Sequence, residues 1–270
     1  MLTGDIHVWQ INLNDASHAF TMSETLLSEE ERKRAQQFIF SVHRTRFVLA
    51  RAFLRVVLSR YVGVPAATIS FGYTAAGKPY LAPNTLDLRF NLSHADCRAV
   101  CAVTHGCEVG IDIERLRVVP DACSVAARFF SRRECDALEA TAEAARDESF
   151  LTCWTRKEAY VKGRGLGLMC ALDGFDVSLS RTTGNALLAT RIEEKDERWW
   201  VHDVAVGPGF VCSLAVQGHT LAALPTYGRS MRLDCASASI CARVQSIGKY
   251  SPRTAGSARF ENNGECACSD

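Results

Sequence analysis

Apolar and polar positions change period several times along the chain, and each change predicts another element. Residues 6–13 alternate between the two types, which is typical of a half-buried strand. From residue 28 to 61, apolar side chains recur every three or four positions, which predicts an amphipathic helix with a break near Ser41. Ser28 precedes three glutamates, the pattern of a helix N-cap, and Gly63 ends the helix.

The rest of the chain predicts short strands mixed with helices. Strands are expected near residues 68–73, 87–91, 98–103, 109–113, 174–179, 186–192, 199–206 and 210–216, and helices near 121–142 and 148–163. Each half of the chain therefore offers helices and several strands. The order predicts a duplicated α+β unit, with halves at 1–107 and 108–222, although the two halves share no evident sequence identity.

The C-terminal segment 223–270 has a different character. It holds few large apolar side chains, is rich in Ser, Ala, Arg and Gly, and shows no sustained period, so a disordered, dispensable tail is expected. Of the twelve cysteines, eight lie between Cys97 and Cys212, mostly inside apolar runs, and four lie in the tail without zinc-site spacing. Free cysteines in a reducing compartment are predicted, and a disulfide within the tail stays open.

Composition and charge exclude several classes of protein. Hydrophobic residues make up 47% and charged residues 23% of the 270 positions, an ordinary globular balance. The net charge of +1 gives no overall field that favours nucleic acid or a membrane surface. No apolar run approaches the roughly 20 residues that span a bilayer. The first residues lack the basic flank of a secretory signal, so a cytoplasmic protein is expected.

The segment 110–114 (Gly-Ile-Asp-Ile-Glu) is the first candidate for chemistry. On a strand Asp112 and Glu114 project from one face while the two isoleucines face the core. Neighbouring carboxylates repel each other unless a positive charge lies between them, and Mg²⁺ prefers such oxygen ligands. The alternative is a solvated strand face on which Arg115 and Arg117 form salt bridges.

The segment 154–162 (Trp-Thr-Arg-Lys-Glu-Ala-Tyr-Val-Lys) is the second candidate. Trp154, Glu158 and Lys162 are four residues apart, so on a helix they share one face. A surface Glu–Lys pair beside a core tryptophan explains this spacing. That is the usual meaning of such spacing, and the alternative is a third carboxylate for a metal site, with a lysine for phosphate one turn later.

Two short segments and a basic helix offer groups that bind phosphate. Residues 77–80 (Gly-Lys-Pro-Tyr) form a turn that carries Lys78, and residues 91–94 (Asn-Leu-Ser-His) end a strand with Ser93 and His94. Residues 29–60 carry eight basic and three acidic side chains. A structural hydrogen bond for the histidine and a solvated helix face are the alternatives.

In combination, these motifs resemble the 4′-phosphopantetheinyl transferases of the surfactin-synthetase-associated (Sfp) type. That family shows a G-[IV]-D-[IVL]-E strand followed about 40 residues later by a W-x-x-K-E-[AS]-x-x-K helix, and both are complete here at 110–114 and 154–162. The segments 77–80 and 91–94 also match, as does 128–131 (Arg-Phe-Phe-Ser) with Glu134 after it. The resemblance covers roughly residues 5–220.

The resemblance implies a pseudo-dimer of two similar α+β halves, with the active site in the cleft between them. It implies Mg²⁺ ligands at Asp112, Glu114 and Glu158, and stabilisation of phosphate charge by Lys162. It also implies contacts to the 3′-phosphate and adenosine diphosphate portion of coenzyme A from a further group of residues: Arg44, Thr45, Lys78, Ser93 and His94.

The implied reaction moves 4′-phosphopantetheine from coenzyme A to a serine of an acyl or peptidyl carrier protein. Adenosine 3′,5′-bisphosphate leaves, and the enzyme is a holo-carrier-protein synthase acting as a cytoplasmic monomer without nucleic acid or membrane. Glu158 is the expected general base, directly or through water, with Glu134 as the alternative. Where Glu31 stands the family often has lysine, so Arg32 or Arg34 would supply that contact. The carrier pathway stays open, as do a non-catalytic binding module and a coenzyme A phosphohydrolase.

Overall fold

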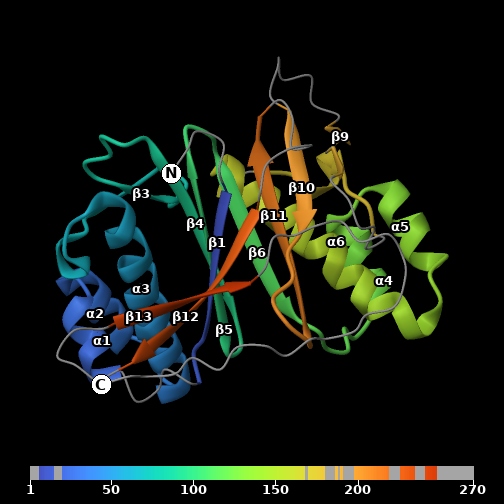
Figure 1. Cartoon of the computed structure of the whole chain (residues 1–270). Helices are drawn as coiled ribbons and strands as arrows, with labels where there is room; N and C mark the ends of the chain where they lie inside the picture. Colours follow the sequence, from blue (N-terminus) through green and yellow to red (C-terminus); the bar gives the residue numbers. More distant parts are fainter. Residues whose placement is uncertain are drawn as a thin grey trace.

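We describe the protein from a computed structural model. It covers residues 6–14, 20–167, 170–179, 186–187, 189–190, 198–218, 226–234 and 241–247. Within these ranges, no helix combines the length and the apolar character that a membrane span requires. The expected α+β class is confirmed, with helices at both sides of a central group of strands (Figure 1).

The first half joins three long strands to a helical layer. Its strands are β1 (Ile6–Asn12), β2 (Phe71–Tyr73), β3 (Pro79–Leu81), β4 (Leu88–Ala95) and β5 (Arg98–His105). Its helices are α1 (Phe20–Leu26), α2 (Glu29–Gln36), α3 (Ser41–Val62) and the 3₁₀ turn η2 (Ala66–Thr68). One face of α3 packs on β1, β4 and β5 through a cluster of fully buried side chains that includes Trp9, Phe53 and Leu54.

The second half repeats this plan with a different chain order. Its strands are β6 (Val109–Arg115), β7 (Phe175–Asp176), β8 (Ala186–Leu187), β9 (Ala189–Thr190), β10 (Trp199–Asp203) and β11 (Phe210–Gln217). Its helices are α4 (Ala122–Phe129), α5 (Arg132–Glu139), α6 (Glu143–Arg164) and the 3₁₀ turn η4 (Leu172–Gly174). The long helix α6 covers β6, β10 and β11, as α3 covers the first sheet (Figure 1).

Two sheets meet at the centre of the molecule. The first has the strand order β13-β12-β1-β5-β4 and the second the order β6-β11-β10-β8, so β4 and β6 are edge strands that face each other. A buried hydrogen bond of 2.9 Å from the Ile111 amide to Asn91 Oδ1 joins these edges. A single apolar cluster continues across them, with Ile6 and Val100 from the first sheet and Leu214 from the second. The two halves therefore share a core.

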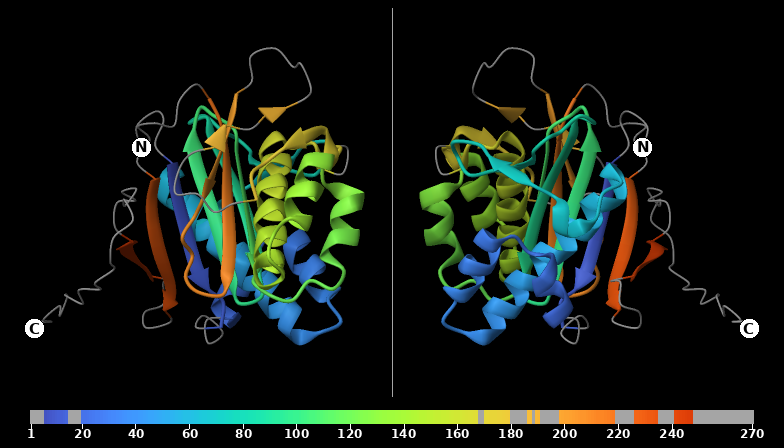
Figure 2. Two further views of the ribbon diagram at one scale, coloured as in Figure 1. Left: turned by 90° about the vertical axis from the view of Figure 1, so that its right-hand side faces the viewer. Right: turned by 90° about the vertical axis from the view of Figure 1, so that its left-hand side faces the viewer.

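Two strands lie in the segment expected to be disordered. β12 (Thr226–Asp234) runs parallel to β1, with pairing from Ile6–Thr226 to Ile11–Met231, and β13 (Cys241–Ile247) pairs antiparallel with β12. Both lie on the side of the molecule away from α4–α6 (Figure 2). The expectation of disorder differs from the structure at these two strands, because an edge of β1 is available for backbone pairing whatever the tail composition. Residues 248–270 lie outside the described ranges.

The helix boundaries differ from the expectations at two places. The break near Ser41 is confirmed, with α2 and α3 on its two sides. The single helix expected over 121–142 is instead α4 and α5, because Phe130 is extended and Ser131 caps a new helix through its hydroxyl. α6 begins at Glu143, five residues before the expected start. The eight cysteines whose pairing the structure describes are free, as predicted.

Candidate active site at the junction of the two halves

Strand β6 fixes two carboxylates on one face. Ile111 and Ile113 are 0% and 1% exposed within the shared core, and the alternation of the strand turns Asp112 and Glu114 to the opposite face. Asp112 is buried at 4% exposure, whereas Glu114 is half-buried, with Arg117 Nη2 at 3.8 Å from its carboxylate. The predicted pairing of these two side chains on one face is confirmed.

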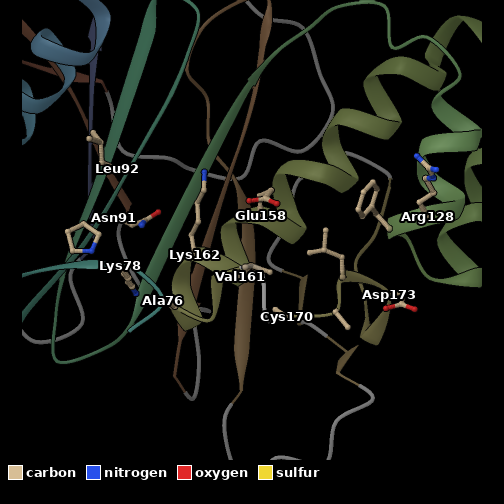
Figure 3. A pocket seen from close by; sticks show the side chains of 17 residues that line it. Ala76, Lys78, Asn91, Leu92, Arg128, Glu158, Val161, Lys162, Cys170 and Asp173 are labelled. Carbon is tan, nitrogen blue, oxygen red and sulfur yellow. The ribbon is translucent and has the colours of Figure 1, made fainter. Parts of the chain in front are cut away.

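Helix α6 brings the second motif against this strand. A Cβ at Gly110 would lie 2.0 Å from the Ala159 carbonyl oxygen, so β6 and α6 are in direct backbone contact there. Glu158 and Lys162 are one turn apart on α6 and project from the same side of the helix (Figure 3). The close approach of the two backbones places both side chains beside the acidic face of β6.

Asp112 is at the centre of a hydrogen-bond network. Lys162 Nζ lies 2.5 Å from Asp112 Oδ1 and 3.2 Å from Ser93 Oγ, and Ser93 Oγ donates to the same carboxylate oxygen at 2.9 Å. The second oxygen, Asp112 Oδ2, is buried and has no hydrogen-bond partner in the described part of the chain. Because an unpaired buried carboxylate oxygen is unfavourable, it marks a position suited to a cation or a donor.

All three carboxylates of the site have raised pKa values. Burial raises the pKa of Asp112, although the Lys162 ammonium acts against this. Burial and then the Asp112 charge raise the pKa of Glu114, and burial also raises the pKa of Glu158, with Lys162 lowering it and Asp112 raising it further. Such repulsion between acids in one cleft is typical of a site that binds positive charge.

The donor chemistry fits a magnesium ion, although the side chains are not assembled around one. Asp112, Glu114 and Glu158 offer hard oxygen ligands, and Asp112 Oδ2 is unpartnered. Across the described ranges, no three acidic, histidine or cysteine side chains are arranged as a closed cation site. The Lys162 ammonium instead neutralises Asp112, so a cation and this lysine compete for the same carboxylate.

Two adjoining cavities open beside these residues. The smaller, of about 540 Å³, includes Glu158 and Lys162 in its wall (Figure 3), and the larger, of about 700 Å³, has a basic lining. The two share four lining residues: Gly77, Pro79, Asn91 and Leu92. The basic side chains of the larger cavity are Arg34, His43, Arg46, Arg51 and His94, and its acidic side chains are Glu30, Glu31 and Asp96. The arrangement suits a long ligand with an anionic end and a thin arm.

Comparison with known proteins shows the family. The profile for the 4′-phosphopantetheinyl transferase superfamily matches residues 108–215, and a profile for 4′-phosphopantetheinyl transferase, N-terminal, matches residues 12–105. The 4′-phosphopantetheinyl transferase HetI of Nostoc sp. is 36% identical over 67% of this chain and 77% of its own length. This chain belongs to the 4′-phosphopantetheinyl transferase family.

Other relatives in this family cover a similar part of the chain. A 4′-phosphopantetheinyl transferase of Bacillus subtilis is 31% identical over 68% of this chain and 84% of its own length. The 4′-phosphopantetheinyl transferase Sfp of Bacillus subtilis is 28% identical over 69% of this chain and 80% of its own length. The predicted resemblance is confirmed.

The expected phosphate contacts of this transferase chain divide into two groups. Ser93 contacts Asp112 and Lys162, and His94 lines the larger cavity, where partial burial and then the charges of Lys162 and Arg46 lower its pKa. Arg44 forms an ion pair with Glu24 at 2.8 Å. Arg44 and Thr45 line neither cavity, whereas their neighbours His43 and Arg46 line the larger one. Helical rotation turns adjacent residues about 100° apart, so the sequence position alone did not fix which one faces the ligand.

The chain has Glu31 where the family often has lysine, and the structure shows what Glu31 and the nearby Arg34 do instead. Glu31 is 6% exposed, closes the capping box of α2 with Ser28, and forms ion pairs with Arg51 and Arg55 at 2.5 and 2.7 Å. It therefore has a structural role. Of the two expected substitutes, Arg34 lines the larger cavity, whereas Arg32 donates to the Leu27 carbonyl.

Lys78 and Glu134 have protein partners that sequence patterns did not indicate. Lys78 Nζ donates to Glu108 Oε2 at 2.7 Å and to the Gly163 carbonyl at 2.6 Å, so it faces the seam between the halves. Glu134 is 2% exposed, caps α5 and pairs with the fully buried Lys157 at 2.8 Å. Glu134 does not line either cavity, which leaves Glu158 as the candidate base.

Proposed function

We propose that the protein transfers 4′-phosphopantetheine from coenzyme A to a serine hydroxyl of a carrier protein. The serine oxygen attacks the β-phosphorus, the pyrophosphate bond breaks, and adenosine 3′,5′-bisphosphate leaves. Membership of the transferase family supports this reaction. The structural observation that carries it is the buried, incompletely paired Asp112 beside Glu114, Glu158 and Lys162, the last two of which line the smaller cavity.

We infer that the reaction depends on Mg²⁺ held by Asp112, Glu114 and Glu158. When bound, the ion would neutralise pyrophosphate charge and align the attacking and leaving oxygens. Lys162, released from Asp112, donates to the phosphate oxygens and stabilises the charge that develops on them. A raised pKa brings Glu158 nearer to neutrality, which improves it as the base for the serine proton, directly or through a water.

The basic larger cavity is the proposed position of the nucleotide end of coenzyme A. His94, Arg46 and Arg34 line it and offer donors to phosphate, and Ser93, next to His94 in the chain, donates to Asp112. The pantetheine arm then lies along the smaller cavity, whose wall includes Val161, Leu172 and Phe129. These two placements bring the pyrophosphate to Lys162 and Glu158.

The proposed setting is the cytoplasm, with the enzyme acting as a monomer on an acyl or peptidyl carrier protein. The eight free cysteines of the described part agree with a reducing compartment. The carrier is expected to come from a fatty-acid, polyketide, peptide-synthetase or aminoadipate pathway, and a panel of carriers would identify it.

Mass spectrometry of a carrier protein incubated with enzyme, coenzyme A and Mg²⁺ tests the function. A gain of one phosphopantetheine group on the carrier, with release of adenosine 3′,5′-bisphosphate, is expected. Release of the nucleotide without modification of any carrier in the panel would instead indicate a phosphohydrolase. Binding of coenzyme A without either product would indicate a binding module. Omission of the enzyme and replacement of Mg²⁺ by chelator are the controls.

A further inference from the structure

The Lys78 side chain joins three segments at the seam between the two halves. Its ammonium lies 2.7 Å from Glu108 Oε2, 2.6 Å from the Gly163 carbonyl oxygen and 3.3 Å from the Val109 carbonyl oxygen. The side chain is 13% exposed. An ammonium has three N–H donors, and three protein acceptors lie within hydrogen-bond distance of this one.

Two of the three acceptors belong to β6 and α6, the elements that carry the acidic and basic groups of the site, and Glu108 directly precedes β6. Gly163 directly follows Lys162 in the last turn of α6, where carbonyl groups have no partner within the helix and a cation is favourable. Val109 begins β6, three residues before Asp112. The ammonium of Lys78 therefore caps the end of α6 and holds the start of β6 at the same point.

The space around the lysine stem is closely filled. A Cβ at Gly163 would lie 3.2 Å from the Gly110 amide nitrogen, so the two backbones touch beside the ammonium. A Cβ at Gly165, which ends α6 with a positive φ of 65°, would lie 3.0 Å from Lys78 Cδ. Gly165 therefore leaves room for the lysine stem, and Gly163 allows the close contact of α6 with β6 beside the ammonium.

The same residue is anchored in the wall of the cavities. The Lys78 amide donates to Thr74 Oγ1 at 3.0 Å, and the neighbouring Gly77 and Pro79 line both cavities. Beyond the seam, the other oxygen of Glu108 accepts a hydrogen bond of 2.8 Å from Arg89. The turn that borders the proposed ligand site is thus tied to the ends of β6 and α6 by one side chain.

We propose that Lys78 is a positioning residue, which fixes Lys162 and Asp112 relative to the ligand-binding turn and does not itself read the 3′-phosphate of coenzyme A. This inference rests on the proposed transferase function. It differs from the role that the sequence motif implies, because the ammonium is bonded to acceptors at the seam between β6 and α6, and Lys78 lines the smaller cavity but not the larger one, where the 3′-phosphate is proposed to bind. A misplacement of about 1 Å at a reacting group can cost about 100-fold in rate, so loss of the clamp acts on turnover.

The test is Lys78→Met, assayed with coenzyme A and with dephospho-coenzyme A as donors. We expect kcat to fall roughly 10- to 100-fold with both donors, while KM for each stays within about threefold and the ratio of the two kcat/KM values is unchanged. Isothermal titration of both donors gives a readout independent of turnover, and the ratio of their dissociation constants should equal that of the wild type. Lys33→Met, which removes an exposed lysine paired with Glu29 on the same helix, is the matched control and should match the wild type.

Two results would overturn the proposal. A ratio of donor affinities that collapses in Lys78→Met, with kcat retained, would make Lys78 a reader of the 3′-phosphate. An unchanged kcat with both donors would mean that the clamp does not position the site. If Lys78→Met does not fold, Glu108→Gln and Lys78→Arg allow the same comparison of kcat with KM. The fall in kcat should be smaller for Glu108→Gln, because glutamine keeps an acceptor for the Lys78 ammonium. If the wild type modifies no carrier, the transferase function fails, and the titrations still decide whether Lys78 reads the 3′-phosphate.

Discussion

At the scale of single residues, the carboxylates of the cleft are unfavourable for the folded protein by themselves. Asp112 is buried with an unpartnered oxygen, and it raises the pKa of both Glu114 and Glu158 after the larger effect of burial. A group whose charge is disfavoured by folding lowers stability at neutral pH. Residues that reduce stability in this way are typical of sites kept for function.

Asp112→Asn and Glu158→Gln should each reduce transfer more than tenfold at saturating Mg²⁺, since a metal ligand or base is lost. The fold should remain, and the melting temperature without metal should stay equal or rise, because one repelling charge disappears. Kinetics and thermal unfolding of the same preparations measure both effects. Glu143→Gln changes an exposed carboxylate at the start of α6 and should be silent. Activity within tenfold of wild type in either site variant would contradict the metal-site assignment.

His202 gives a prediction on stability against pH. Its Nε2 atom is buried without a hydrogen-bond partner in the described ranges, and burial lowers its pKa from 6.5 to about 4, with Asp203 acting in the opposite direction. The unfolded chain therefore binds this proton more readily. The contribution of the neutral His202 ring to the free energy of unfolding is fully present above pH 6.5. It is lost as the pH falls towards 4, and the total loss is about 3 kcal/mol.

The measurement is the free energy of unfolding between pH 7 and 4. His202→Leu should remove about 3 kcal/mol of the acid-induced loss, because leucine does not titrate and faces Leu214 on the neighbouring strand. His43→Leu, at an exposed imidazole on α3, is the control and should leave the pH dependence as in the wild type. An identical acid loss in His202→Leu and wild type would rule out this histidine as its source.

Residue identities in the site were predictable from the sequence, but their partners were not. The alternation of β6 predicted that Asp112 and Glu114 share a face, because the period of a strand is fixed by backbone geometry. The four-residue spacing on α6 predicted the same for Glu158 and Lys162, because the period of a helix is fixed in the same way. That the two faces meet was implied by the family resemblance alone. The partners of Lys78 lie 30 and 85 residues away in the chain, and no local pattern encodes such distances. A lysine in a turn looks the same whether it faces a phosphate or a helix end.

At the scale of elements, helix boundaries depend on caps as much as on apolar period. Ser28 was recognised as a cap, whereas the same Ser-x-x-Glu pattern at Ser131 was not, and the structure shows a complete capping box at both. The apolar period continues from α4 into α5 and so conceals the break. Most strands were predicted within a few residues, although the segment expected over 186–192 is two short strands, β8 and β9. The three-residue strand β3 was read as part of a turn, since so few residues show no period.

Glu134 supports a prediction about how α5 is held to α6. It accepts from the Ser131 and Val177 amides and pairs with Lys157, which is 0% exposed. Glu134→Gln leaves a buried ammonium without its anion and should cost about 3–5 kcal/mol of stability. Activity per folded molecule should fall less than tenfold, because the side chain does not reach the cleft. Glu139→Gln, an exposed site on the same helix, is the control in denaturant unfolding. Complete inactivity of a folded Glu134→Gln would restore it as the base.

The pairing of β12 with β1 changes the expectation for the tail. Deletion after residue 225 would leave the β1 edge without its parallel partner, and each lost hydrogen bond contributes about 0.5–1.5 kcal/mol. A lower melting temperature and more aggregation are expected, with activity per folded molecule retained because the site lies on β4, β6 and α6. Truncation after Ile247 keeps every described strand and is the control. An unchanged melting temperature in the shorter truncation would show that β12 adds no stability.

At the scale of the whole molecule, the site depends on how the two halves meet. β4 and β6 face each other through Asn91 and Ile111, and Ser93 on β4 reaches Asp112 on β6. A duplicated α+β order was readable from the sequence, but the edge that joins the halves was not, because strand pairing between distant segments follows from packing and not from local period. Among the described residues, the larger cavity is lined by the first half alone, whereas the smaller cavity, with Glu158 and Lys162, is lined by residues of both halves, so neither half contains the site alone.

Docking of the carrier protein is the remaining whole-molecule question, and we expect it to be electrostatic and local. The net charge of +1 gives little long-range attraction for an acidic carrier. Of the basic side chains near α4 and α5, Arg132 pairs with Asp136, and Arg133 lies 3.8 Å from Asp176. Arg128 is exposed beside the smaller cavity, and in the described ranges it forms no ion pair (Figure 3). It is therefore the cation available to a partner at the mouth of the site.

The carrier KM should rise with salt, because exposed charges are screened beyond roughly 8–10 Å at 0.1–0.15 M ionic strength. Arg128→Ala should raise the KM for the carrier at low salt and weaken the salt dependence of that KM, because it removes a charge at the rim of the site. The KM for coenzyme A should stay within about threefold, because Lys162 remains in place. Arg132→Ala is the matched control with a smaller effect, because Asp136 already neutralises that charge. Steady-state kinetics over a salt series with one acidic carrier measures all three proteins. A KM that is independent of salt in the wild type would contradict electrostatic docking and favour apolar contact through Phe129, which is 41% exposed beside Arg128.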